Sequence, residues 1–345
     1  MTAPLTGDSA NVILLGRAIG HAVLTERFKN HEARRILRVL DEEVLPDLAA
    51  RLAGRLENIA TRGFDVGPQT TARLRFLYRD LGNFFDDLAR RLRTETEDQL
   101  VDYATAQAAQ LARDVRREVG TLASVVTPST GAIRAAVLGR PFAGSTLRDR
   151  WGSRAASFRS KVEAQVRIGL VQGEVPAQIV RRVRALWPAE RRKVASTVGS
   201  AVRHAQAQAR QATYEENRGL LAGVMWVATL DVSTCPVCGG LDGKVLPVDS
   251  GPRPPLHPGP CRCATVPILK SAKDLGGTRA SMDGQVPKAV KWAEWIGSQS
   301  ADRQDEILGV GVAKLFRAGR IDVGDLVDGA GHAVTLERLA ELSAR

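Results

Sequence analysis

The chain of 345 residues has no cysteine outside one short stretch, because all four of its cysteines lie between Cys235 and Cys263. Aromatic residues make up only 5% of the sequence, so the core must be built mainly from aliphatic side chains. No apolar run approaches the roughly 20 residues that span a bilayer, which argues against a transmembrane protein. The first 20 residues carry no basic leader before their apolar patch, so we expect no signal peptide and synthesis in a reducing cytoplasm. Clustered cysteines in such a compartment bind metal more often than they form disulfides.

Positive charge is concentrated in one region of the chain. The formal net charge is +11, and the segment from Arg140 to Arg210 holds 15 Lys or Arg residues against 4 Asp or Glu residues. Such an excess predicts an anionic partner or an acidic protein surface, although a charged helix face is also commonly just solvated. The predicted centre of this binding surface lies on both sides of Pro188 and consists of Arg181, Arg182, Arg184, Arg191, Arg192 and Lys193.

The spacing of apolar residues predicts a mainly α-helical protein. Leucine and phenylalanine recur every three or four residues from Leu74 to Leu92, which places them on one helix face. We expect helices over 32–61 and 72–119, and a Thr-, Ser- and Gly-rich connection over 127–145. A β-prone segment, VMWVATL, leads into the cysteine stretch.

The predicted fold class is mainly α, with a small zinc-stapled β-hairpin module between helical regions. The apolar residues of the tail stand at helical spacings and are expected to pack together: Trp292, Trp295, Ile296, Ile307, Leu308, Leu315 and Phe316. Changes in composition divide the chain into five regions: an N-terminal helical body (1–139), a basic helical region (140–222), a Cys-rich zinc-ribbon-like module (223–270), a linker (271–285) and a short C-terminal helical region (286–345).

Prolines and glycines give three further local expectations. Pro176 opens a helix, and Pro188 interrupts the pattern so that the next helix begins at Arg191. Gly239 permits a positive φ that turns backbone amides toward sulfur. Asp242-Gly243 suits a type I′ hairpin turn.

The cysteine stretch has the spacing of a structural zinc site. Cys235 and Cys238 form a C-x2-C pair, Cys261 and Cys263 form a C-x-C pair, and His257 stands four positions before Cys261. Zinc takes four Cys or His ligands in a tetrahedron, so five candidates compete for four places, with Cys261 and His257 as alternatives. No open position or acid–base pair is evident nearby, which favours a closed structural site over a catalytic one. Reduced cysteines without metal, or a disulfide formed later, are the other readings.

Three separated blocks carry a resemblance to a known family. The stretch TLDVSTCPVCGGLDGKV, followed by PPLHPGPCRC, resembles the signature of the phage head morphogenesis (Mu-type minor capsid) family. Upstream, GEVPAQIVRRVRALWPAERRKVASTVGSAVRHAQAQARQATYEEN is similar to the helical lead-in of that family, with matches at Arg192, Ala195, Thr197 and Asn217. Downstream, WAEWIGSQSADRQDEILGVGVAKLFRAGRIDVGDLVDGAGHAVTLERL resembles the tail of many members.

The resemblance covers Gly173 to Leu339 and leaves the N-terminal helices without a matching motif. Two details differ from the family. Gly259 and Pro260 separate the His-Pro from C-R-C where one residue is usual, and Ser233 stands where the family often has arginine.

The resemblance implies a non-enzymatic minor structural protein of a tailed-phage head. Its expected partners are portal and capsid proteins, with non-specific DNA contact as a further possibility, and its expected location is the host cytoplasm during assembly and then the virion. A metal-dependent nuclease is one alternative, but it needs a histidine base beside a second metal-binding residue, and His257 stands alone in its part of the sequence. A zinc-containing DNA-binding protein is another, but no helix suited to a groove follows the cysteines.

Overall fold

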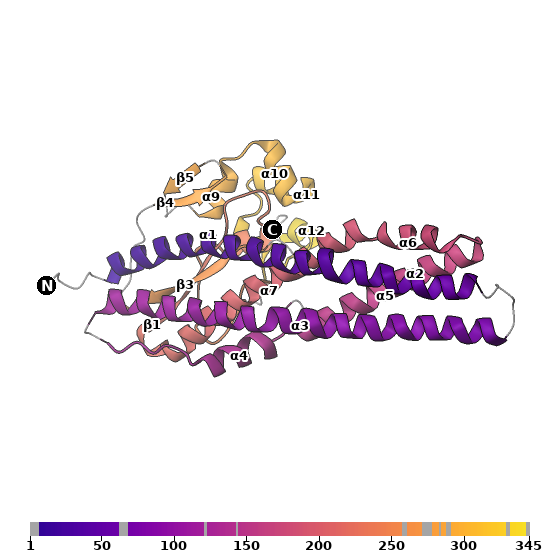
Figure 1. Cartoon of the computed structure of the whole chain (residues 1–345). Coiled ribbons are helices and arrows are strands. Elements are labelled where there is room, and N and C mark those ends of the chain that lie inside the picture. Colours follow the sequence, from indigo (N-terminus) through magenta and orange to yellow (C-terminus); the bar gives the residue numbers. More distant parts are fainter. Residues whose placement is uncertain are drawn as a thin grey trace. The chain divides into compact units, whose positions relative to one another are not determined.

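The computed structural model describes residues 7–61, 68–120, 123–142, 144–256, 261–270, 278–282, 284–287, 291–328 and 332–342. Helices dominate this part of the chain and the sheets are small, so the predicted mainly α class is confirmed (Figure 1). The helices are α1 (Gly7–Val39), α2 (Leu45–Ala60), α3 (Pro68–Val119), α4 (Thr130–Gly139), α5 (Leu147–Val171), α6 (Pro176–Arg184), α7 (Trp187–Glu216), α8 (Pro236–Leu241), α9 (Trp292–Gly297), α10 (Ala301–Leu308), α11 (Val310–Arg317) and α12 (Leu336–Leu342). A π-helical segment, η1 (Leu40–Val44), joins α1 to α2, and η2 (Arg218–Leu220) and η3 (Val323–Leu326) are short 3-10 helices. The strands are β1 (Leu221–Val227), β2 (Val245–Leu246), β3 (Ala264–Leu269), β4 (Thr278–Ser281) and β5 (Gly284–Pro287). None of the helices in these residues is both long enough and apolar enough to cross a membrane.

The long helices follow the apolar periodicity, but their ends do not. The helix expected over 72–119 is α3, whereas the helix expected over 32–61 begins as early as Gly7. The connection expected over 127–145 is wrong, because α4 occupies most of it. Ser129 begins that helix as a side-chain cap, with its Oγ accepting the N–H of Ala132 at 3.2 Å.

The chain forms two compact units, each assembled from segments that lie far apart in the sequence. The first unit consists of Met1–Arg27, Val101–Ala143 and Val202–Arg345, and the second of Phe28–Leu100 and Gly144–Ala201. The five consecutive regions expected from the sequence stay a proposal about the organisation along the chain.

The second unit is helical and has an aromatic centre. Phe85 packs edge-on against Phe158, with ring centroids 5.3 Å apart. Trp151 is fully buried, and its indole N–H donates to Thr96 Oγ1 at 3.0 Å, so burial leaves its only polar group satisfied. Aliphatic side chains of α2, α3, α5 and α6 fill the rest of this core.

Helix α6 and the first part of α7, up to Ala201, belong to this second unit. Pro176 opens α6 as expected. The next helix begins at Trp187, one turn before the expected Arg191, because Pro188 lies in the first turn, where its missing N–H breaks no helical hydrogen bond.

The first unit contains a three-stranded antiparallel sheet in the order β2-β1-β3. Met225 of β1 pairs with Val245 on one side and with Val266 on the other. The first turns of α1 and the last turns of α3 pack with this sheet through a buried cluster that includes Leu14, Leu15, Leu111, Val115, Val224 and Val266. This sheet positions the cysteine stretch, since the stretch runs from the end of β1 to the start of β3.

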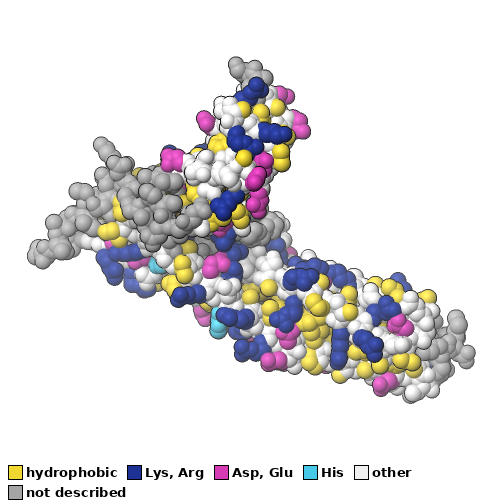
Figure 2. Space-filling model, turned by 90° about the horizontal axis from the view of Figure 1, so that it is seen from above, with side chains coloured by type: hydrophobic (Ala, Val, Ile, Leu, Met, Phe, Trp, Pro, Cys, Tyr) yellow, Lys and Arg dark blue, Asp and Glu magenta, His cyan; other side chains and the backbone are white. Residues whose placement is uncertain are grey.

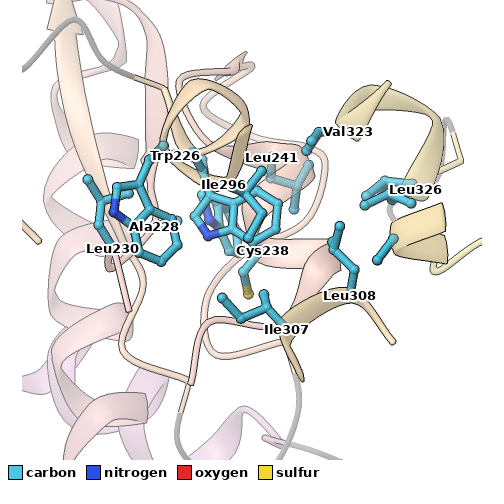
Figure 3. Packing of buried hydrophobic residues seen from close by; sticks show 14 of the residues in the cluster. Trp226, Ala228, Leu230, Cys238, Leu241, Ile296, Ile307, Leu308, Val323 and Leu326 are labelled. Carbon is cyan, nitrogen blue, oxygen red and sulfur yellow. The ribbon is translucent and has the colours of Figure 1, made fainter. Parts of the chain in front are cut away.

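A second buried cluster of the first unit joins the cysteine stretch to the tail (Figure 3). Cys238 and Leu241 of α8 pack there with Trp226 of β1 and with residues of α9, α10 and η3. The expected packing of the tail residues is confirmed, because Trp292, Trp295, Ile296, Ile307 and Leu308 are buried in this cluster and Leu315 and Phe316 pack against it. Residues of the Cys-rich module and of the tail thus share one buried cluster.

Candidate metal centre

The first cysteine pair lies at the start of α8. Cys235 has an extended backbone (φ −69°, ψ 153°), and its Sγ accepts the backbone N–H of Cys238 at 3.4 Å. Pro236 takes the first helical position, where proline is favoured. The first turn of the helix therefore brings Cys235 next to Cys238.

The second pair lies at the start of β3 and meets the first pair. Cys261 and Cys263 stand two residues apart directly before β3, and in an extended chain this spacing projects both side chains to the same side. The Sγ atoms of Cys238, Cys261 and Cys263 all lie within 4.8 Å of one another, and those of Cys238 and Cys261 are 3.9 Å apart. Two sulfurs on a tetrahedral zinc, each bonded at about 2.3 Å, are about 3.8 Å apart. These three cysteines can therefore hold a metal ion.

The other two predicted ligands are placed less closely by the structure. Cys235 contacts the group through its hydrogen bond with Cys238, and none of the four cysteines is in a disulfide. His257 lies outside the described residues. The sequence left Cys261 and His257 as alternatives, and the structure places Cys261 together with Cys238 and Cys263. The identity of the fourth ligand stays a prediction.

The clustered thiols control one another's ionisation. Hydrogen bonds from the thiols of Cys238 and Cys263 lower the pKa of Cys261. The hydrogen bond with Cys235, together with contacts to the other two cysteines, raises the pKa of Cys238. A first thiolate is thus favoured at Cys261, and further thiolates in the same site need a neutralising cation.

An ion pair that the sequence did not reveal fastens the two cysteine-bearing segments together. Arg262, between the cysteines of the second pair, pairs with the carboxylate of Asp231, four residues before Cys235. The other Asp231 oxygen accepts the N–H of Ser233 at 2.9 Å, which forms a tight turn leading into α8. Asp231 and Arg262 both lie in the sequence blocks that resemble the family. Their presence in these blocks was the one indication in the sequence that they have a structural role.

Asp242 is a second fastening point. Its Oδ1 accepts the N–H of Ala228 at 2.7 Å, and its Oδ2 accepts the N–H of Trp292 at 2.8 Å. It also occupies the turn after α8, where Lys244 N–H donates to Leu241 O at 2.9 Å. With Asp242 at φ −57° and ψ 129° and Gly243 at φ 74°, this is a type II turn, so the expected type I′ turn is wrong.

Gly239 has a different role from the one expected. It lies inside α8, and its φ is not among the positive values of the described glycines, so it does not use left-handed backbone. A Cβ at this position would lie 2.3 Å from Cδ2 of Trp292. At Gly240 a Cβ would lie 2.8 Å from Cγ2 of Val327. The two glycines therefore let the tail approach the helix that carries Cys238.

The predicted anionic-partner residues divide into two groups, all in the second unit. Three of them are engaged within the chain: Arg182 pairs with Glu174, Arg191 with Asp41 at 2.6 Å, and Lys193 with Glu190 at 3.0 Å. Arg181, Arg184 and Arg192 are exposed, and they have no ion pair with the residues that the structure describes. Over the face seen in Figure 2, Lys and Arg side chains are spread out with Asp and Glu among them.

The comparison with protein families gave one match. Residues 160–266 match the family described as Phage Mu protein F like protein. This match supports a phage head morphogenesis family. The matched segment covers less than half of the chain, runs from within α5 into β3, and contains α6, α7, Asp242 and all four cysteines. Neither the curated proteins nor the solved structures gave a match.

Proposed function

We propose that the protein is a minor structural component of a tailed-phage head that acts near the portal and supports head assembly and DNA packaging. The family match over 160–266 carries this proposal. Portal and capsid proteins are its partners, and the protein passes from the host cytoplasm into the phage head during assembly.

The same proposal gives the cysteines a structural role. Cys238, Cys261 and Cys263 hold a zinc ion, and Cys235 is the fourth ligand because it shares the first turn of α8 with Cys238. Four thiolates leave no position for a reacting water, so the ion stabilises the fold rather than performing chemistry. The support is the sulfur spacing together with the thiol ionisation described above.

The basic helices supply the contact with an anionic partner. The exposed Arg181, Arg184 and Arg192 are the free cations of this surface among the described residues, while Arg182, Arg191 and Lys193 have partners within the chain. An acidic face of the portal is the proposed partner, and non-specific contact with DNA phosphates is the alternative.

The decisive experiment is to delete the gene from the phage and complement it in trans with a tagged copy. We expect the deletion to abolish DNA-filled heads, the tagged copy to restore them, and the tag to sediment with portal and capsid proteins in purified heads. Normal particle yield without the gene, or a tag absent from assembling heads, would refute the proposal.

A further inference from the structure

A cavity of about 320 Å³ lies within the first unit, beside the cysteine stretch. Small residues of α1 and α7 form one wall, and the ends of β1 and β3 form another. Its lining is mostly apolar, with a few polar groups, and includes Ala18, Ala22, Ala207, Ala228, Ala264 and Val266. Ligand-binding cavities in proteins have this character and volumes of about 300–1,000 Å³.

Arg210 places a positive charge in this lining. The residue is only 5% exposed. Its Nη1 donates a hydrogen bond to the backbone oxygen of Thr265 at 2.7 Å, and the hydroxyl of Tyr214 donates to the same oxygen at 2.8 Å. A guanidinium has five N–H donors, and this hydrogen bond to the Thr265 carbonyl uses one of them. The remaining donors of Arg210 can bind another acceptor.

No carboxylate in the described part of the chain neutralises Arg210. Glu26, which also lines the cavity, forms an ion pair with Arg203 at 2.9 Å. The third arginine of the lining, Arg262, pairs with Asp231. Of the three arginines in the lining, two are thus paired with carboxylates, and Arg210 alone has no ion pair with the residues that the structure describes.

A buried guanidinium without a counter-charge is costly, and such groups are normally paired or neutralised. An anion entering the cavity would supply that counter-charge through strong, planar hydrogen bonds of the kind that arginine forms with carboxylates. The apolar walls would at the same time favour a hydrophobic body over a small hydrated ion.

We infer that this cavity binds a carboxylate carried on a small apolar body, with the carboxylate on Arg210 and the apolar part against the alanines of α1 and α7. Two sources provide this chemistry. One is a free organic acid, and the other is an acidic side chain within an extended segment of another protein. The inference does not depend on the proposed phage function, since it rests on the cavity and on Arg210 alone.

Calorimetric titration of the full-length, zinc-loaded protein tests the inference. One arm compares octanoate with the neutral octanamide, and the other compares a short acetylated peptide bearing one glutamate among valines with its glutamine version. We expect one site and, in at least one arm, a preference of about tenfold or more for the charged probe. The arm that binds identifies the source. If neither charged probe binds, or each binds no better than its neutral partner, the inference is wrong.

Two variants locate the site. Ala207→Leu fills the cavity and should abolish binding, whereas Ala195→Leu, on the same helix but outside the lining, should leave it unchanged. Arg210→Met should remove the preference for the charged probe. If Arg210→Met does not fold, Ala207→Leu decides alone: binding that survives it places the probe elsewhere and overturns the inference.

Discussion

The side chain of Asp242 accepts the backbone N–H of Trp292, 50 residues further along the chain, at 2.8 Å. The same carboxylate accepts the N–H of Ala228 at 2.7 Å. One buried side chain therefore connects the end of β1, the turn after α8 and the start of α9. The L-D-G of the family signature is in this way a structural link between the cysteine module and the tail.

Asp242→Asn should destabilise the first unit. Each carboxylate oxygen of Asp242 accepts one backbone N–H, and in asparagine one of these oxygens is replaced by an NH₂ group that cannot accept a hydrogen bond. A buried donor left unsatisfied costs about 1–3 kcal/mol. Chemical denaturation followed by tryptophan fluorescence will measure the change, and hydrogen exchange at Trp292 should accelerate. Asp249→Asn, at an exposed aspartate that pairs with Arg218, is the matched control. Equal stability of the two variants would contradict the role of Asp242.

Gly239→Ala should loosen the packing of the tail on α8, because its Cβ would overlap the Trp292 ring. Overpacking of this kind costs about 1–3 kcal/mol. The measurement is the unfolding midpoint together with limited proteolysis of the tail. Gly324→Ala is the control, since a Cβ at that position meets nothing within 4 Å. A tail that stays equally protected in both variants would show that the close approach is not required.

Purified protein should contain about one zinc ion per chain, as a closed four-ligand site requires. Cys238→Ser should lose the metal and, because metal binding supplies folding energy to such segments, should unfold the region from β1 to β3 while leaving the helices of the second unit intact. Elemental analysis and circular dichroism will test this. Freshly purified, reduced protein without metal would refute the zinc site.

The fourth ligand is decided by a matched pair of variants. Cys235→Ser should lower zinc content as Cys238→Ser does, whereas His257→Ala should retain one zinc. The reverse result would assign the fourth position to the histidine. Ser233→Ala, in the turn just before the site, serves as the control for local disturbance.

The sequence predicted much of this site because its signals are local. The cysteine spacing was enough to expect that Cys235, Cys238 and Cys263 meet together with either Cys261 or His257, but it could not choose between the last two. The contacts of Asp242 and Gly239 could not be predicted from the sequence. Both residues contact Trp292, and no local sequence pattern indicates a contact between residues so far apart. The sequence led us to expect a positive φ at Gly239. In the structure its importance lies in the absence of a side chain, which lets Trp292 approach closely.

The interiors of the helices could be predicted from the sequence, but their ends could not. The interior of α3 follows from the repeat of leucine and phenylalanine, because burial of one face enforces that spacing. The start of α1 and the existence of α4 did not follow, since Thr, Ser and Gly favour turns and helix starts alike. The cavity beside Arg210 was likewise hidden, because the alanines that line it come from separate elements.

The ionised carboxylate of Glu190 should stabilise the second unit, and this stabilisation should be lost at acidic pH. Burial opposes ionisation of this carboxyl, but hydrogen bonds from Lys161 at 2.5 Å and Lys193 at 3.0 Å outweigh burial and lower its pKa. A lowered folded-state pKa contributes stability that is fully present above the unfolded value of about 4.3 and is lost as the pH falls through the folded value. Denaturation across this range should show the loss in the parent protein and its absence in Glu190→Gln, with the exposed Glu57→Gln behaving like the parent. An unchanged pH profile in Glu190→Gln would contradict the assignment.

Reversing the charge of the exposed arginines should abolish binding to the anionic partner. The change Arg181→Glu, Arg184→Glu and Arg192→Glu leaves the ion pairs of Arg182 and Arg191 in place, so folding should be preserved and only long-range attraction lost. The control reverses three exposed arginines of α3: Arg75, Arg113 and Arg117.

Portal pull-down and DNA gel shift, each at two salt concentrations, separate the two partners. If the partner is the portal, pull-down should weaken with salt, fail in the variant and persist in the control, while free DNA binds poorly. If the partner is DNA, the logarithm of affinity should fall against the logarithm of salt concentration with a slope of about −0.9 per neutralised phosphate, and the variant should flatten that slope. If portal binding, DNA binding and particle yield all survive the triple reversal, these arginines form only a solvated helix face, and the proposed basic contact is wrong.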